Sequence, residues 1–244
     1  MVLEICTGSI ESVIAAKEGG AQRVELCSAL LEGGVTPSVG FMREARKVEG
    51  LKMNVLIRPR GGDFLYSEEE IQIMIEDIKT AKAFGADGVV IGALTSEGDV
   101  DTEACRRMIA AAEGMSITFH RAFDMVRDAD EALETIISLG CHRILTSGLR
   151  RTVEEGIPML KHLVEKAAER IIIMPGSGVS PKNASKIIAE TGATEIHASA
   201  RSEKQSGMNY RNPLAKMGAS DVDEFARKET DKTIVNTIIR SLNL

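Results

Sequence analysis

Short apolar runs alternate with longer stretches of mixed polarity along the chain. The runs are rich in β-branched residues, and the stretches between them repeat apolar residues at helical spacing. This pattern predicts eight β-strands that alternate with amphipathic helices. The strands are expected at residues 3–6, 23–27, 53–57, 88–91, 116–120, 143–145, 171–174 and 195–198.

The predicted helices begin at polar residues suited to capping and end at glycines. Ser67, Asp128 and Thr152 are each followed three residues later by a glutamate, which is the spacing of a capping box. Ser180 precedes a proline, and proline favours the first helical position. These four residues are therefore expected to start helices.

A short template recurs ahead of every second predicted strand. A glycine, a small residue and two polar or small residues lead into the strand, beginning at Gly20, Gly85, Gly140 and Gly192. The four βαβα quarters predict an α/β fold, a single (β/α)8 TIM-like barrel of parallel strands. A doubly wound open sheet is the alternative, but it gives no reason for a fourfold repeat. We expect one domain over residues 1–244, with residues 199–219 as a long loop after the eighth strand.

The composition narrows the class of protein. The 244 residues are 43% hydrophobic and 27% charged, which suffices for a large core. A net charge of −6 and a pI near 5.4 predict binding to neither nucleic acid nor a membrane surface. No apolar run approaches the roughly 20 residues that span a bilayer, and the first residues read as a strand. Four cysteines without a Cys-x-x-Cys motif fit a reducing compartment, so we expect a cytoplasmic protein.

Period-two alternation places several polar side chains inside the predicted barrel. Since closure makes the eighth strand a neighbour of the first, Glu4, Glu25 and His197 are expected to form one cluster. Cys6, Cys27 and Ser199 would lie one step higher. The cluster is either a buried ion network that fixes the register of the barrel or a ligand or metal site.

Other charged residues follow the third and fifth strands. Arg58 and Arg60 come at the end of the third strand, and His120, Arg121 and Asp124 at the end of the fifth. Chemistry in α/β folds is carried out at the carboxyl ends of strands. We therefore expect these side chains around the mouth of the barrel, where Arg58 and His120 would face the cluster.

The seventh and eighth loops suggest an anion site. Gly176, Ser177 and Gly178 form a small turn after the seventh strand, and Ser199 and Arg201 follow the eighth. Barrels commonly bind phosphate at this place, through loop amides, a helix N-terminus and a nearby cation. A small anionic ligand is therefore expected there.

Cys6 and Cys27 lie at equivalent ends of adjacent predicted strands, so their sulfurs can approach each other. Two soft thiolates with few hard ligands suit Cu(I). The alternative is that both are small buried apolar residues, which is the commoner place of a free cysteine.

A series of motifs resembles the CutC family over about the first 200 residues. The motifs are LEIC at 3–6, RVELCS at 23–28, EGGVTPS at 32–38, IRPRGGDF at 57–64, TFHRAFD at 118–124, ILTSG at 144–148 and GSGV at 176–179. The resemblance implies a TIM-like barrel, a cytoplasmic location, a homo-oligomer (dimer or tetramer) and a part in copper homeostasis. It also implies Cu(I) binding at Cys6 and Cys27, which match the family's cysteines.

Two functions of different class follow. In the first, the protein binds Cu(I) through Cys6 and Cys27, with the rest of the chain as scaffold. In the second, it is an enzyme acting on a small phosphorylated or carboxylated metabolite, with His120, Glu25, Arg58 and His197 as candidate catalytic residues. The sequence leaves both open.

Overall fold

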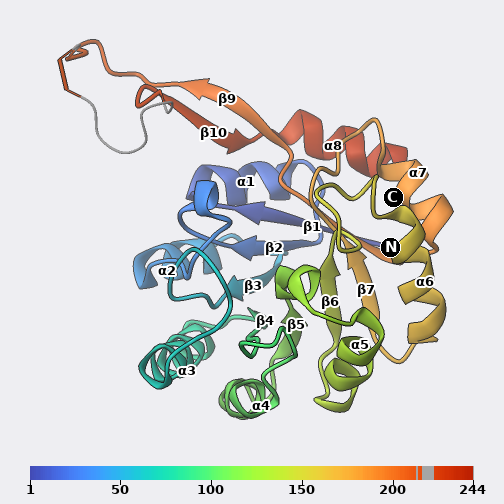
Figure 1. Ribbon diagram of the computed structural model, residues 1–244. Helices are drawn as coiled ribbons and strands as arrows, with labels where there is room; N and C mark the ends of the chain where they lie inside the picture. The colour runs from blue at the N-terminus through green and yellow to red at the C-terminus, as the bar shows by residue number, and fades with distance from the viewer. Residues whose placement is uncertain (213, 216–222, 244) are drawn as a thin grey trace.

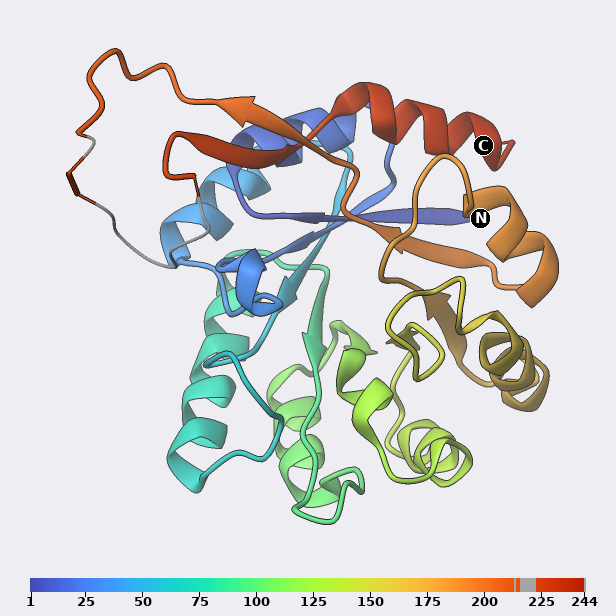
Figure 2. The ribbon, with the colours of Figure 1, turned by 45° about the horizontal axis from the view of Figure 1, so that its top comes forward.

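The computed structural model describes residues 1–212, 214–215 and 223–243. Within these residues, eight parallel strands curve into a nearly closed barrel, and the helices lie around its outside (Figures 1 and 2). The fold is therefore the TIM-like α/β barrel that the repeat predicts.

The barrel strands lie close to their expected positions. They are β1 (Val2–Thr7), β2 (Arg23–Leu26), β3 (Lys52–Leu56), β4 (Gly88–Ile91), β5 (Ser116–Phe119), β6 (Arg143–Thr146), β7 (Ile172–Pro175) and β8 (Glu195–Ala198). The helices of the described chain are α1 (Ile10–Glu18), α2 (Val39–Arg46), α3 (Glu68–Ala83), α4 (Thr102–Ala111), α5 (Ala129–Ser138), α6 (Ile157–Ala167), α7 (Ala184–Thr191) and α8 (Lys232–Ser241), with 3-10 turns at Leu30–Glu32 and Arg121–Met125.

The sheet order runs from β7 through β6, β5, β4, β3, β2 and β1 to β8. β1 pairs with both β2 and β8, which confirms that the last barrel strand returns to the first. β7 and β8 pack side by side, but no backbone ladder joins them among the described residues. The barrel therefore has a seam between these two strands.

Two predicted helix starts are confirmed and two are wrong. Ser67 forms a full capping box, and the Asp128 side chain accepts from two backbone N–H groups of α5. Thr152 starts only an isolated turn, because α6 begins five residues later, behind Gly156. Ser180 donates its backbone N–H to the side chain of Asn183, which forms a separate turn before α7.

The segment 199–219 is not simply a loop. Its residues Arg201–Gln205 form β9, which pairs antiparallel with β10 (Ala226–Thr230). This hairpin projects beyond the barrel in both views (Figures 1 and 2). Within the expected loop, residues 213 and 216–219 lie outside the described part of the chain.

Apolar residues divide into two groups. The larger core lies between the barrel sheet and the surrounding helices. A second, small cluster of Cys6, Cys27, Leu56 and Val90 lies inside the barrel. This inner cluster forms part of the floor on which the candidate site is built.

Candidate functional site

A cavity of about 280 Å³ opens at the carboxyl ends of the barrel strands. Its lining includes eleven of the residues that the sequence singles out. They are Cys6, Glu25, Cys27, Arg58, His120, Arg121, Ser177, Gly178, His197, Ser199 and Arg201. The fold thus brings together groups from strands that are far apart in sequence.

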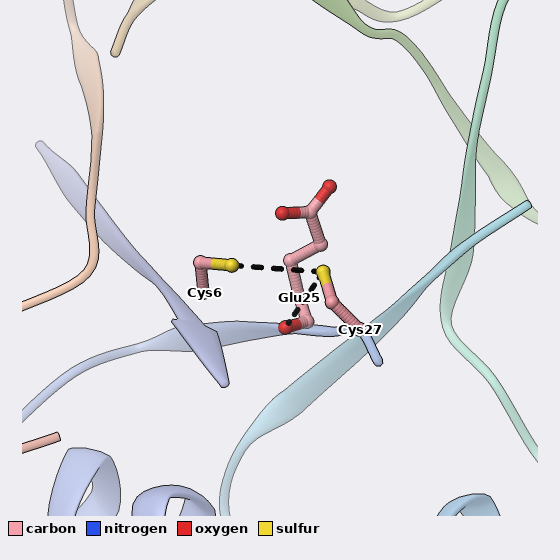
Figure 3. A group of neighbouring side chains, drawn as sticks. All are labelled: Cys6, Glu25 and Cys27. Carbon is pink, nitrogen blue, oxygen red and sulfur yellow. Dashed lines mark hydrogen bonds between the residues drawn. The ribbon is translucent and has the colours of Figure 1, made fainter. Parts of the chain in front are cut away.

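Cys6 and Cys27 face each other on the cavity floor. Their Sγ atoms are 3.6 Å apart, and both side chains are buried (Figure 3). The two residues lie on adjacent parallel strands, Cys6 in β1 and Cys27 directly after β2. The predicted approach of the two sulfurs is therefore present in the structure.

The heights of the lumen residues differ from the expected arrangement. Glu4 is level with His197, but Glu25 is level with Cys6 rather than with Glu4. The strands of a closed barrel are staggered, so neighbouring strands do not present equivalent residues at one height. Because of this register, Cys6 pairs with Glu25 along the strands while its sulfur contacts that of Cys27.

His197 connects the two glutamates. Its Nδ1 lies 2.9 Å from Glu4 Oε1, and its Nε2 lies 3.6 Å from Glu25 Oε2. Burial by itself would lower the pKa of His197, but contacts with Cys6, Glu4 and Glu25 outweigh it and raise the pKa well above its usual value. The expected Glu4, Glu25 and His197 cluster is therefore formed, with His197 as its cation.

The two glutamates differ in charge. Burial alone would raise the pKa of Glu4, but the charge of Arg23 and the hydrogen bond with His197 lower it to about 2. Burial raises the pKa of Glu25 to about 8, against a partial opposing effect of His197. Near neutral pH, Glu4 is a carboxylate and Glu25 mostly keeps its proton.

The two thiols also differ. The hydrogen bond from Cys27, followed by contacts with His197, lowers the pKa of Cys6 well below its usual value. Burial and the neighbouring Cys6 raise the pKa of Cys27 well above it. The pair therefore favours one thiolate, on Cys6, with the Cys27 thiol as its donor. With Glu25, these residues offer two sulfurs and an oxygen within 4.8 Å of one another, and such a set can hold a metal ion.

A buried ion network lies below this floor, and its arginines were missed in the sequence. Arg23 contacts both Glu4 and Glu195, and Arg143 donates from Nε to Glu195 at 3.0 Å. Arg143 and Glu195 occupy the same position in the internal repeat as Arg23, four residues into the template. Side chains from alternate strands form one layer of a TIM barrel, so this shared position was the signal that could have found them.

His120 lies on the opposite wall of the cavity. Its Nδ1 accepts the backbone N–H of Ala122 at 3.1 Å, so the ring hydrogen resides on Nε2. Nε2 is buried and has no hydrogen-bond partner among the described residues. Burial, followed by the charge of Arg58, lowers the pKa of His120 to about 3. His120 is therefore a neutral donor near pH 7, and Glu25 is the better suited of the two to proton transfer there.

Arg58 braces the loops above the third strand. Its guanidinium donates to the carbonyls of Glu32, Gly34 and Gly62, at 3.0, 2.9 and 2.6 Å. Its Cζ lies 5.0 Å from the centre of the Phe64 ring. The remaining donor, Nε, is buried without a partner among the described residues.

Arg121 and Asp124 form an ion pair that connects two loops, and they are not placed as a catalytic acid and base. Arg121 Nε donates to Asp124 at 2.7 Å, and Asp124 accepts further bonds from Ser147 and from the backbone N–H of Leu149. Arg121 lines the cavity, whereas Asp124 lies behind it. These contacts fasten the fifth loop to the sixth.

Two other expected mouth residues lie outside the cavity lining. Glu4 is fully buried below the floor, in contact with Arg23. Arg60 turns away to Asp63 and Glu70, and its Cζ lies 5.3 Å from the ring of Tyr66. Neither side chain contributes to the wall of the cavity.

Four of the five expected anion-binding residues line the cavity. Ser177, Gly178, Ser199 and Arg201 line the cavity, but Gly176 does not. A Cβ on Gly176 would lie 2.6 Å from Leu145 and 3.5 Å from His197, so only glycine lets β7 approach the site. The hydroxyl of Ser177 donates to the carbonyl of Arg151 at 3.1 Å and is not free.

No helix in the described part of the chain has the length and apolarity needed to cross a bilayer. This finding agrees with the absence of a long apolar run in the sequence.

Comparisons with known proteins agree with the motifs. A "Copper homeostasis protein cutC homolog" from Mus musculus is 49% identical over 238 residues, which cover 97% of this chain and 88% of the relative. A family protein CutC from Bacteroides fragilis is 51% identical over 243 residues, covering 99% of this chain and 97% of the relative. Copper homeostasis is thus the role named for similar proteins.

Solved structures support the same grouping. The crystal structure of CutC from Streptococcus agalactiae is 37% identical, with a TM-score of 0.79, and covers 82% of this chain and 98% of that one. Thiamine phosphate pyrophosphorylase from Pyrococcus furiosus shares only the fold, with a TM-score of 0.61 at 17% identity. The model of the CutC family matches residues 1–202. This chain therefore belongs to the CutC family.

Proposed function

We propose that this protein binds Cu(I) in the mouth of its barrel, through the sulfurs of Cys6 and Cys27. The observation that carries the proposal is the 3.6 Å separation of the two Sγ atoms on the cavity floor. Soft thiolates favour Cu(I), and the low pKa of Cys6 supplies a thiolate without a large proton cost. Similar proteins named for copper homeostasis support the choice of metal.

The distance between the sulfurs favours a bent site. At a metal–sulfur distance of about 2.3 Å, sulfurs 3.6 Å apart subtend roughly 100° at the metal. A linear two-coordinate site would need the sulfurs to separate to about 4.6 Å. A third ligand therefore fits better, and Glu25 is placed to supply it.

Substitution of both cysteines by serine tests this proposal. The double variant C6S/C27S is expected to lose Cu(I) affinity at least about 100-fold, because hard hydroxyls replace both soft ligands. Affinity is measured by competition with a colorimetric Cu(I) chelator under anaerobic conditions. Unchanged affinity in the double variant would contradict the proposal.

A matched control uses another buried cysteine. Cys141 is free and buried but does not line the cavity. Cys141→Ala removes one thiol and is expected to leave Cu(I) affinity unchanged. Equal loss in this variant and in C6S/C27S would indicate nonspecific thiol binding. Repeating the competition with Zn²⁺ tests whether the site prefers the monovalent ion.

The same proposal includes a cytoplasmic location and a homo-oligomer. The four cysteines are free, as suits a reducing compartment. The β9–β10 hairpin extends from the barrel (Figure 1) and carries the exposed side chains of Met208 and Tyr210. A two-stranded hairpin is only marginally stable by itself in water, so contact with another copy would stabilise it.

A further inference from the structure

The cavity contains donors that the copper site does not use. In the described chain, four buried side-chain N or O atoms lack a hydrogen-bond partner, namely Arg58 Nε, Tyr66 Oη, His120 Nε2 and Arg201 Nε. Three of these four belong to residues that line the cavity. A buried donor without an acceptor costs about 1–3 kcal/mol, so their shared location calls for a ligand.

Two of the three residues are cations without a carboxylate partner. Within the described chain, neither Arg58 nor Arg201 forms an ion pair with an acidic side chain. Arg58 is only 5% exposed, and its charge is balanced by carbonyl dipoles and the Phe64 ring rather than by a carboxylate. Arg201 stabilises the thiolate of Cys6 electrostatically, but no hydrogen bond joins them. A buried charge without a counter-ion is unfavourable, so this side of the cavity is suited to an anion.

Arg58 and His120 both lie close to the ring of Phe64. The Cζ of Arg58 lies 5.0 Å from the centre of the Phe64 ring, and the centre of the His120 ring lies 5.0 Å from the same point. His120 is neutral, since its Nδ1 is already an acceptor and its Nε2 carries the hydrogen. The charge of Arg58 also acts on the His120 ring, so the two residues are near enough to offer one cationic donor and one neutral donor to the same ligand. Arg201 adds a second cation from the eighth loop.

Apolar side chains also line the cavity. Leu30, Leu56, Phe64 and Leu145 line the same space as these donors. A bare inorganic ion would leave these surfaces facing water. An organic anion would bury them, and a cavity of about 280 Å³ can hold a small one.

We propose that the cavity binds a small organic oxyanion, a carboxylate or a phosphate ester. Its charged head accepts hydrogen bonds from Arg58, His120 and Arg201, and its apolar part packs on the leucines. The three donors are not ligands of the proposed copper site, so anion binding does not require copper. The seventh-loop turn contributes little, because the hydroxyl of Ser177 is already bonded to Arg151.

Calorimetric titration of the copper-free protein tests the inference. The probes are acetate, butyrate, inorganic phosphate and phenyl phosphate, each at up to about 10 mM. We expect butyrate to bind more tightly than acetate, or phenyl phosphate to bind more tightly than inorganic phosphate. Binding of the carboxylate pair or of the phosphate pair identifies the head group that the cavity prefers. No binding by any probe overturns the proposal, and equal affinity within each pair overturns the apolar half of it.

Two variants assign the donors. Arg201→Gln and His120→Asn are each expected to weaken binding about tenfold or more, because each removes one donor to the head group. Asparagine can still accept the backbone N–H of Ala122, so His120→Asn keeps that loop bond. Arg60→Gln removes a cation that faces away from the cavity and should bind like the wild type. Unchanged affinity in both test variants overturns the assignment.

The cysteine variants separate this site from the copper site. C6S/C27S keeps all three donors and removes the Cys6 thiolate that shares the charge of Arg201, so it is expected to bind the same anion at least as tightly as wild type. A parallel loss of anion binding in C6S/C27S would overturn the independence of the two sites. Loss of copper binding alone leaves the anion site intact.

Discussion

The lower lumen and the mouth of this barrel both bury charged side chains, but they balance the charges differently. Below, Arg23 contacts Glu4 and Glu195, and Asn54 donates to Glu4 at 2.9 Å. Above, Arg58 and Arg201 have no acidic partner in the described chain, and the Nε2 of His120 has no acceptor there. His197 lies between the two regions, paired with Glu4 on one side and near Glu25 on the other.

The pairing of the charges distinguishes a structural role, which suits the lower lumen, from a binding role, which suits the mouth. A buried ion network whose members are all paired can fix strand register without needing a ligand, although similar apolar packing would be as stable. Unpaired buried charges and donors are a cost that a bound ligand can remove. The sequence left the Glu4, Glu25 and His197 cluster open between these roles. The paired charges of the lower lumen fit the first role, and the unpaired donors of the mouth support the binding that we propose.

The largest expected effect on stability comes from a substitution that disrupts the ion network of the lower lumen. Arg23→Met leaves Glu4 and Glu195 without their shared cation, and the loss of one partner from a buried network costs about 3–5 kcal/mol. Urea unfolding followed by circular dichroism at pH 7 measures the free energy of unfolding. A loss below about 1 kcal/mol would show that the network contributes little to stability.

A smaller effect concerns the unpartnered His120 in the mouth. The folded protein protonates His120 only near pH 3, whereas the unfolded chain does so near pH 6.5. The unfolded chain therefore binds more protons between these values, so stability falls as the pH is lowered. This single residue is expected to remove about 2 kcal/mol of stability between pH 7 and pH 5.

His120→Asn isolates that contribution. The other titrating groups are the same in both proteins, so the variant should lose about 2 kcal/mol less than wild type over this pH range. Urea unfolding at pH 7 and pH 5 gives the two differences. Equal losses in the two proteins would mean that His120 takes up a proton readily in the folded state.

The smallest expected effect tests whether an ion pair stabilises the folded protein as much on the surface as it does when it is buried. Arg107 makes two hydrogen bonds to Glu68, at 2.7 and 2.6 Å, but this pair is on the surface. Arg107→Met is the same substitution as in the lower network and should shift the urea midpoint less than about one fifth as much. Comparable shifts in the two variants would show that burial does not distinguish the networks.

Much of the fold could be predicted because it depends on local patterns. Strand positions followed from apolar runs, and barrel closure followed from the fourfold repeat. The hairpin could not be found in this way, since β9 and β10 are polar, largely exposed strands that pair across a long sequence separation. Thr152 and Ser180 have the right local chemistry for caps, but the chain after them turns before a helix begins.

The sequence by itself determined which residues reach the inside of the barrel, because strand side chains alternate with a period of two. It therefore identified Cys6, Cys27, Glu25 and His197 as lumen residues. Only the tertiary structure decided their partners, since the stagger of the strands sets the height of each side chain. It also decided that Arg58 uses three loop carbonyls and leaves one donor free. Such contacts join segments that are distant in sequence, so no local pattern contains them.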